Sequence, residues 1–303
     1  MGVVPYQVTY GSLIKRDLST PIDSILNALN ESLSTYVPES EISEFNRTHQ
    51  LSFRSPFFLP ILEASKEIYQ ATAGAYDPTV GPLVNLWGFG PGKEGTLPDS
   101  LAINNALQQV GFRKIAYDAQ TVSSNSEPYL DFSAIAKGYA VDLVAEYLYN
   151  VGVKDFYVEI GGEIRCAGKN PSNEIWKTGI YDPRVADVPD KQVAAIVSVE
   201  NKAIATSGNY RNFYVKDGKK YAHTISPFTG YPVEHSLLSA SVFADDCMTA
   251  DAYATAFMVL GVAPSIKLAE ANPQLDVHLI YADESGALQT YTSERIRNSI
   301  ILE

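Results

Sequence analysis

Apolar positions recur at helical spacing in several stretches of the chain. The first stretch has its apolar side chains at Ile22, Ile25, Leu26, Leu29 and Leu33. Thr20-Pro21 precedes it and provides a capping residue followed by a proline suited to the first helical position. The pattern predicts an amphipathic helix with one buried face. Further helices are expected around residues 61–69, ended by Gly74, and near 103–110 and 264–271.

Other segments have the composition of strands, and several are joined as hairpins. Segments 212–215 and 220–223 flank Asp217-Gly218, the strongest local hairpin signal in the chain, and 276–281 turns at Ser285-Gly286 into 288–291. Strands are also expected near 6–10, 114–117, 121–123, 129–131, 156–164, 179–181, 193–199, 203–206 and 238–244. Because strands outnumber helices and the two do not alternate strictly, we expect an α+β fold with mainly antiparallel sheets and flanking helices.

Residues 74–90 show neither the helical spacing of apolar side chains nor the alternation of a strand. They combine glycines, prolines and large apolar side chains, which predicts an ordered loop held by its own aromatic groups. Loops of this kind often line binding sites. A packed loop without a ligand is the alternative.

Residues 246–261 predict a long helix on which the rest of the chain is organised. Thr249 is the expected N-cap, and Gly261 stands where the helix would end. Asp251 and Thr255 are four residues apart, so their side chains lie on one face near the start of the helix. A carboxylate and a hydroxyl suit Mg²⁺, which keeps positions for water and phosphate. Alternatively, Asp251 is only a first-turn residue that the helix dipole stabilises, and Thr255 only packs.

Residues 129–142 predict a strand, a tight turn and a helix. Asp131 and Lys137 lie at the edge of this turn. The exposed amides of such a helix start, together with Lys137, can hold a phosphate, while Asp131 can accept hydrogen bonds from a base or ribose. A capping aspartate and a solvated lysine would give the same pattern.

Two shorter motifs carry candidate chemistry. Gly161-Gly162 interrupts the segment 156–164, which suggests that backbone approaches another group closely. His223 stands at a strand end beside a turn, where a histidine either transfers protons or stabilises the turn. Neither a dinucleotide-binding fingerprint nor a P-loop is present in the sequence.

Composition and charge exclude several classes of protein. The chain has 303 residues, of which 46% are hydrophobic and 19% charged, as in an ordinary globular protein. Its formal net charge of -12 argues against nucleic-acid binding. No apolar run approaches the roughly 20 residues that a membrane span needs. Cys166 and Cys247 match no zinc or redox spacing.

Taken together, the motifs resemble a known family, the ApbE-type flavin transferases (FAD:protein FMN transferases). The matching segments occur in the family's order and cover nearly the whole chain. They are Ser34-Thr35-Tyr36, Ser40-Glu41-Ile42, Phe45-Asn46, residues 75–84, residues 131–142, Gly161-Gly162-Glu163, residues 206–210, residues 223–230 and residues 251–255.

The resemblance implies a fold and a set of site residues. The fold would be a single domain over residues 1–303, with two closely joined lobes, no assignable boundary and an FAD cleft between them. Asp251, Thr255 and the backbone carbonyl of Ala134 would bind Mg²⁺, and His223 would be the catalytic histidine. The FAD contacts would come from Met1, Thr35, Ala75, Tyr76, Asp77, Asp131, Lys137 and Ile225, with Asn46 near the site.

The implied activity is Mg²⁺-dependent transfer of the FMN moiety of FAD to a threonine hydroxyl of an acceptor flavoprotein, with AMP released. Two alternatives remain: an FAD pyrophosphatase, in which water replaces the acceptor, and an FAD-binding protein without turnover. The resemblance suggests an acceptor such as a membrane redox-complex subunit, and a periplasmic location as an envelope lipoprotein. Met1 leads almost directly into the segment 6–10. This leaves a cytoplasmic protein, or one whose export signal lies outside this sequence.

Overall fold

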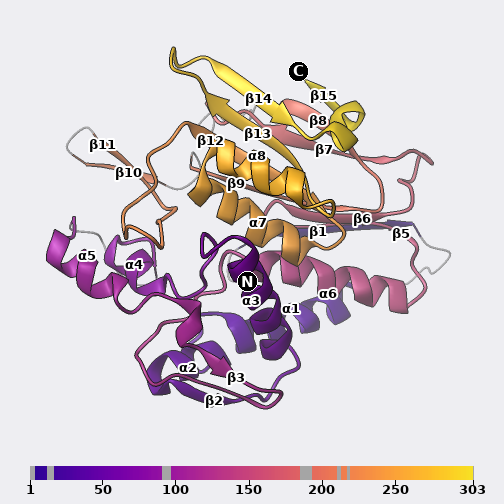
Figure 1. Ribbon diagram of the computed structural model, residues 1–303. Helices are drawn as coiled ribbons and strands as arrows, with labels where there is room; N and C mark the ends of the chain where they lie inside the picture. Colours follow the sequence, from indigo (N-terminus) through magenta and orange to yellow (C-terminus); the bar gives the residue numbers. More distant parts are fainter. Residues whose placement is uncertain are drawn as a thin grey trace.

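The computed structural model describes residues 4–11, 17–90, 97–184, 193–209, 213–216 and 219–302. Helices and antiparallel sheets form two closely joined lobes, with the largest sheet in the upper lobe of Figure 1. The predicted α+β class with mainly antiparallel sheets is confirmed.

A sheet of seven strands is the centre of the upper lobe. Every neighbouring pair in it is antiparallel. Side chains alternate between two faces along a strand, and both faces of this sheet are covered, so buried positions dominate its central strands. The strands in spatial order are β1 (Tyr6–Gly11), β5 (Asp155–Ile160), β6 (Glu163–Ala167), β9 (Ala203–Gly208), β12 (Leu237–Ala244), β13 (Asp276–Ala282) and β14 (Leu288–Thr292).

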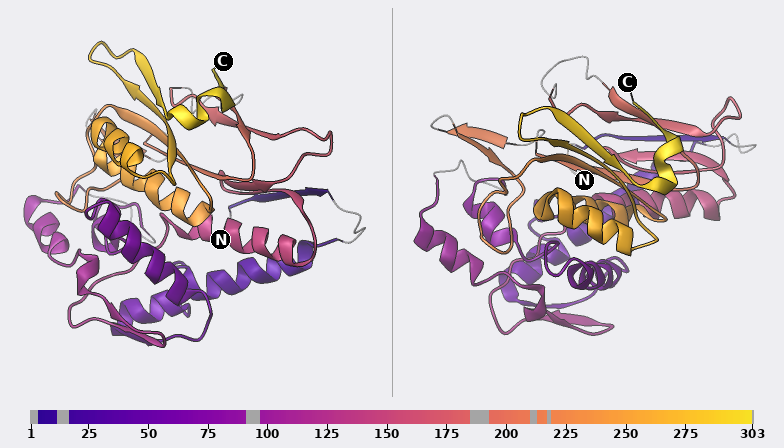
Figure 2. Two further views of the ribbon diagram at one scale, coloured as in Figure 1. Left: turned by 45° about the vertical axis from the view of Figure 1, so that its right-hand side comes forward. Right: turned by 45° about the horizontal axis from the view of Figure 1, so that its top comes forward.

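Helices cover one face of this sheet. α6 (Ala136–Asn150) packs on β5 and β6, α7 (Cys247–Leu260) on β9 and β12, and α8 (Val262–Ala271) on β13. α1 (Ser19–Leu33) and α3 (Phe58–Ala71) form the next layer, beneath α6 and α7 (Figure 2). The largest hydrophobic core fills these layers with side chains from Leu18 to Leu279. The prediction of one domain over residues 1–303 stays a prediction.

A small sheet covers the opposite face. It consists of β15 (Ile300–Leu302), β8 (Val193–Val199) and β7 (Trp176–Tyr181), and a short 3₁₀ helix (Glu294–Ser299) leads into it. Trp176 and Val197 of this sheet pack against Ile164, Phe243 and Ile280 of the large one. The two sheets therefore enclose a second apolar layer.

The lower lobe contains short elements. A three-stranded sheet consists of β2 (Gln50–Ser52), β4 (Thr121–Ser123) and β3 (Ala116–Tyr117), with a 3₁₀ turn at Phe112–Lys114 before it. The helices are α2 (Glu41–Thr48), α4 (Gly81–Leu86) and α5 (Ser100–Leu107).

The predicted hairpin is confirmed as β10 (Phe213–Lys216) and β11 (Lys219–Ala222), while its turn lies outside the described residues.

A separate small core joins two segments that are far apart in sequence. Leu83, Trp87, Ile103 and Ile225 form this core. In addition, the indole Nε1 of Trp87 donates a hydrogen bond to the carbonyl of Gly230 over 2.7 Å. The segment 75–90 is thereby fixed to the segment 223–230.

Two helices begin earlier than predicted. Asp246, rather than Thr249, is the N-cap of α7, and its side chain accepts a hydrogen bond from the Thr249 amide at 2.7 Å. α1 begins at Ser19, whose amide donates to Asp17 Oδ1 at 2.9 Å. At α7 the carboxylate of Asp246 accepts one of the free amide hydrogens of the helix start, whereas the N-cap of α1, Leu18, offers no side-chain acceptor.

Three other local predictions were wrong in detail. No strand forms at 129–131, where Tyr129 makes only an isolated bridge to Val80. The expected loop 74–90 contains the short helix α4, with a proline in its first turn. The segment 156–164 is a hairpin, β5 and β6, because Gly161 and Gly162 have φ values of +68° and +105°, which turn the chain back. Within the described ranges, none of the helices has the length and apolarity needed to span a bilayer.

Candidate active site

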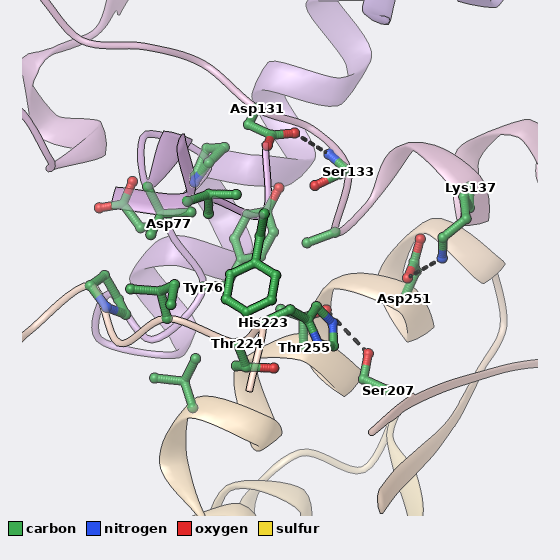
Figure 3. A pocket seen from close by; sticks show the side chains of 18 of the residues that line it. Tyr76, Asp77, Asp131, Ser133, Lys137, Ser207, His223, Thr224, Asp251 and Thr255 are labelled. Atoms are coloured by element: carbon green, nitrogen blue, oxygen red, sulfur yellow. Dashed lines mark hydrogen bonds and ion pairs between the residues drawn. The ribbon is translucent and has the colours of Figure 1, made fainter. Parts of the chain in front are cut away.

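A cavity of about 380 Å³ collects most of the residues that the sequence singled out (Figure 3). Its lining comes from segments that span the chain, from the loop after α1 to α7. The predicted site residues in its lining are Thr35, Ala75, Tyr76, Asp77, Asp131, Ala134, Lys137, His223, Ile225, Asp251 and Thr255. Met1 lies outside the described residues.

One side of the cavity is formed by the starts of α6 and α7. The Gly138 amide of α6 donates to Asp251 Oδ2 at 3.0 Å, and Lys137 Nζ lies 3.5 Å from Asp251 Oδ1. The same ammonium lies 2.5 Å from Glu163 Oε1, at the start of β6. Burial alone would lower the pKa of Lys137, but the carboxylates of Asp251 and Glu163 outweigh burial and raise it. Lys137 is therefore charged.

The close crossing of α6 and α7 sets this geometry. A Cβ at Gly138 would lie 2.2 Å from the Cys247 carbonyl oxygen, so only glycine permits the approach. The buried Asp142 of α6 accepts hydrogen bonds from the amides of Cys247 and Met248 at 2.9 and 2.8 Å. Burial raises the pKa of Asp142 to about 6, although Arg165 and these amides oppose the shift. The two helices therefore share one buried polar joint.

The oxygen atoms on this side fit a magnesium ion. Asp251 and Thr255 lie one turn apart on α7, and Thr255 Oγ1 lies 3.2 Å from Ser207 Oγ. Two buried carboxylates, those of Glu163 and Asp251, face a single ammonium on this side. No group of three His, Cys, Asp or Glu side chains suited to a metal occurs in the described ranges. A site with one carboxylate, a hydroxyl and the Ala134 carbonyl would leave positions for water and phosphate, as Mg²⁺ prefers.

The opposite wall is the segment 75–90. Asp77 Oδ1 accepts hydrogen bonds from the Thr79 amide at 2.9 Å and from its hydroxyl at 2.6 Å. Burial raises the pKa of Asp77, and these hydrogen bonds limit the rise. The buried hydroxyl of Tyr76 lies 2.9 Å from Ser65 Oγ. The expectation that this stretch is an ordered loop of the kind that lines binding sites matches its place in the cavity lining.

Asp131 lies between the wall and the start of α6. Its Oδ1 accepts a hydrogen bond from the Ser133 amide at 2.8 Å, and burial raises its pKa. Asn46 is not in the cavity lining. Its side chain makes two hydrogen bonds to the backbone of Leu130, of 2.9 and 2.7 Å. Asn46 thus fixes the chain immediately before Asp131.

His223 directly follows β11 and lines the cavity. Its ring meets that of Phe89 edge to face, with the centroids 6.3 Å apart. Phe89 comes from the wall segment, so the histidine lies where the two segments joined by the small core meet. This position is compatible with proton transfer to a bound molecule.

Several lining residues were missed as site residues by the sequence analysis. Glu163 and Ser207 appeared only as members of motifs, and Phe89 only within the loop. For Glu163 the available signal was its place directly after Gly161-Gly162, which marked a close backbone approach. Its partner Lys137 is distant in sequence, so the pairing itself had no local signal.

Comparison with known proteins gives one consistent result. The ApbE family profile matches residues 1–279. An FAD:protein FMN transferase of Vibrio cholerae is 38% identical over 93% of this chain and 85% of its own length, and that of Haemophilus influenzae is 40% identical over 88% and 78%. The structure is similar to flavin transferase ApbE from Vibrio cholerae (TM-score 0.87, 36% identity, 97% and 95% covered). It is also similar to apo flavinyl transferase ApbE from Pseudomonas stutzeri (TM-score 0.86, 32%, 97% and 92%).

Proposed function

This chain belongs to the ApbE family, and from that premise we propose that it transfers the FMN moiety of FAD to an acceptor protein and releases AMP. The observation that carries the proposal is the cavity, which brings together the acidic, basic and hydroxyl side chains of motifs spread over the chain. The relatives that bear the name FAD:protein FMN transferase match along most of their length.

The reaction is a phosphoryl transfer. A threonine hydroxyl oxygen of the acceptor forms a bond to the FMN phosphorus, and the bond from that phosphorus to the bridging oxygen of the pyrophosphate breaks. AMP leaves with the bridging oxygen. The hydroxyl proton passes to a base, and we assign that role to His223, which lines the cavity.

Asp251, Thr255 and the Ala134 carbonyl are the proposed holders of Mg²⁺. When bound, the ion would neutralise charge on the pyrophosphate oxygens in the transition state. Lys137 contributes a fixed positive charge at the same side of the cavity. Holding the reacting groups in line is the remaining task, and it falls to the cavity walls.

FAD is proposed to bind along the wall segment and the start of α6. Thr35, Ala75, Tyr76, Asp77 and Ile225 line the cavity on one side, and Asp131 accepts hydrogen bonds from base or ribose. Met1 remains a proposed contact from the sequence alone.

The acceptor and its location are also proposals. The family resemblance supports an acceptor such as a subunit of a membrane redox complex, and an envelope lipoprotein facing the periplasm. Membrane fractionation of cells that produce the full-length protein, followed by flavin fluorescence of the separated membrane proteins, would test both. If both the protein and its flavin-bearing acceptor were recovered in the cytoplasmic fraction, the proposed periplasmic location would be wrong.

The deciding experiment incubates the protein with FAD, Mg²⁺ and a threonine-bearing acceptor domain, and follows AMP, free FMN and the acceptor mass together. We expect the acceptor to gain one FMN in step with AMP. Asp251→Ala should abolish the gain, and removal of Mg²⁺ by a chelator should do the same. AMP with free FMN and no mass gain for any acceptor would support an FAD pyrophosphatase instead. Intact FAD throughout would leave a binding protein.

A further inference from the structure

Glu163 is a buried carboxylate whose interactions do not account for its burial. Its side chain is 5% exposed, and Oε1 is held by Lys137 Nζ at 2.5 Å. Oε2 is buried and has no hydrogen-bond partner among the residues that the structure describes. A buried ion pair that is only partly hydrogen-bonded is a poor source of stability, because desolvation offsets the attraction. The position of Glu163 therefore points to a role in the cavity.

The lysine has two acidic neighbours at unequal distances. Its ammonium lies 2.5 Å from Glu163 Oε1 and 3.5 Å from Asp251 Oδ1. Asp251 is itself only 3% exposed. The short contact shows that the lysine is paired with Glu163, while the longer one leaves Asp251 Oδ1 without a tight partner.

The turn before β6 fixes Glu163 in this place. A Cβ at Gly161 would lie 2.8 Å from Val4 Cγ1, and at van der Waals distance from the pair itself, 3.4 Å from Glu163 Oε2 and 3.5 Å from Lys137 Cδ. The turn therefore lies next to the pair. Glu163 is the first residue of β6 in the large sheet, and Lys137 lies in the first turn of α6. Two rigid elements therefore set their separation.

Without the charge on Glu163, the ammonium would have one carboxylate left to pair with. A lysine side chain is flexible at its end, and Asp251 Oδ1 is already within 3.5 Å of Nζ. A tight pair between Lys137 and Asp251 would occupy the oxygen proposed to bind Mg²⁺ and would place a positive charge beside the ion.

We propose that Glu163 is a positioning residue that holds the ammonium of Lys137 away from Asp251, so that Asp251 remains free to bind Mg²⁺ and Lys137 faces the pyrophosphate. This inference rests on the proposed function of the cavity. Glu163 acts through Lys137 and touches neither the ion nor the reacting atoms.

The first test is Glu163→Gln, which preserves shape and removes charge. A calorimetric titration of the variant with Mg²⁺ alone should show an affinity for Mg²⁺ that is weakened about 10- to 100-fold, as for other residues that orient a metal ligand. In the transfer assay, the Mg²⁺ concentration for half-maximal rate should rise equally. Saturating Mg²⁺ should restore kcat to within about threefold, since no group that acts in the chemical step is lost.

The second test removes the lysine charge. Lys137→Met should bind Mg²⁺ at least as tightly as the unmodified protein, while its affinity for FAD in the presence of a chelator falls. The double variant Glu163→Gln/Lys137→Met should recover the Mg²⁺ affinity that Glu163→Gln alone has lost. Recovery by a second substitution is a result that mere damage to the fold would not give. Melting temperatures of all three variants provide the check on folding.

Three results would overturn the inference: unchanged Mg²⁺ affinity in Glu163→Gln, no recovery in the double variant, or weaker Mg²⁺ binding in Lys137→Met than in the unmodified protein. No recovery would mean that the double-mutant cycle detects no coupling between the two residues. The binding measurements need no turnover. An unmodified protein that binds Mg²⁺ and FAD but transfers no FMN to an acceptor would therefore refute the proposed function and leave the role of Glu163 in place.

Discussion

At the scale of single residues, the cavity combines groups with different surroundings. Asp131 and Asp77 are carboxylates whose pKa values are raised by burial, and each accepts hydrogen bonds from a nearby turn. Lys137 keeps its charge because acidic neighbours outweigh burial. His223 contacts an aromatic ring from the opposite wall. Substitution of each residue therefore tests a different part of the reaction.

His223→Ala tests the proposed proton transfer. We expect the rate of FMN transfer to fall by roughly 10²- to 10⁴-fold, the usual contribution of a general acid or base. The affinity for FAD should change little, because the ring meets only one part of the wall. Stopped assays of AMP and equilibrium titration of FAD would measure the two quantities.

His49→Asn is the matched control for His223→Ala. His49 caps α2 in the left-handed region, with φ of 55°, which asparagine tolerates, and it is not in the cavity lining. This variant should retain its rate. Equal activity of His223→Ala and the control would remove His223 from the mechanism.

His278 tests electrostatics outside the cavity. It is buried in β13, Nδ1 lies 2.8 Å from Thr292 Oγ1, and burial lowers its pKa to about 4. The unfolded chain binds a proton near pH 6.5, so the folded state loses stability as the pH falls from about 6.5 to 4, by up to about 3 kcal/mol. Denaturant titrations at several pH values should show that the free energy of unfolding of His278→Asn depends less on pH in this window. If it falls with pH as steeply as in the unmodified protein, the assignment to His278 is wrong.

Some residues of the candidate site could be predicted from the sequence because they lie within local motifs, whereas Thr35, Ala75 and Ile225 were given only by the family resemblance. Asp251 and Thr255 share a helix face, and Lys137 starts a helix after a turn. The sequence could not show that Glu163 pairs with Lys137, nor that Asn46 uses its amide on Leu130. Both contacts join segments brought together only by the packed fold.

At the scale of elements, the pair α6 and α7 presents the residues to which we assign the chemistry. Asp142 of α6 accepts two amide hydrogens from the first turn of α7, and Arg165 of β6 lies 2.7 Å from the same carboxylate. Gly138 allows the helices to touch. Lys137 and Asp251 are therefore presented by one rigid unit.

Gly138→Ala tests this unit. The added methyl group would lie 2.2 Å from the Cys247 carbonyl, so α6 and α7 must separate. We expect a loss of about 1–3 kcal/mol in the free energy of unfolding. We also expect weaker Mg²⁺ binding, because the Gly138 amide would leave Asp251 Oδ2. Urea titration and calorimetry would measure these two effects.

Gly11→Ala is the control, since its added Cβ would meet Asp155 Cβ at an ordinary 3.5 Å. It should keep its Mg²⁺ affinity. If Gly138→Ala behaves like Gly11→Ala, the helices tolerate separation and the interpretation of the joint is wrong.

Hydrophobic spacing predicted most helices and strands, but it misplaced the starts of two helices and did not predict the short helix α4. The start of α7 was misplaced because Asp246, upstream of the expected cap, accepts the free Thr249 amide, and α1 begins at Ser19, beside Asp17, without a side-chain cap. α4 has only six residues, too few for a periodic pattern. The segment 129–131 reads as a strand, but its neighbours in space leave it a single bridge.

At the scale of the whole molecule, segments from both lobes line the cavity. Its lining runs from Thr35 to Val259, through loops, the start of α6, β9 and α7. A molecule bound there contacts segments from the entire chain, so its binding energy adds to the stability of the whole fold rather than to one part.

FAD should therefore stabilise the protein as a unit. With a chelator present to prevent turnover, FAD at about 100 times its Kd should add about 2.7 kcal/mol to the free energy of unfolding. Thermal denaturation followed by circular dichroism should show a single transition that moves up by several degrees. A second transition that ignores FAD would mean that the lobes unfold independently. AMP alone, which lacks the flavin, is the control and should shift the transition less.

The small core of Leu83, Trp87, Ile103 and Ile225 has a consequence for how such an enzyme can diverge. It anchors the wall segments to one another, apart from the large core that supports α6 and α7. Substitutions there can reshape the wall while the oxygen atoms proposed for the ion stay in place. Descendants of one ancestor can thus differ in how tightly they hold the flavin nucleotide while they inherit the same chemistry, and a mutant library confined to these four positions would sample that freedom directly.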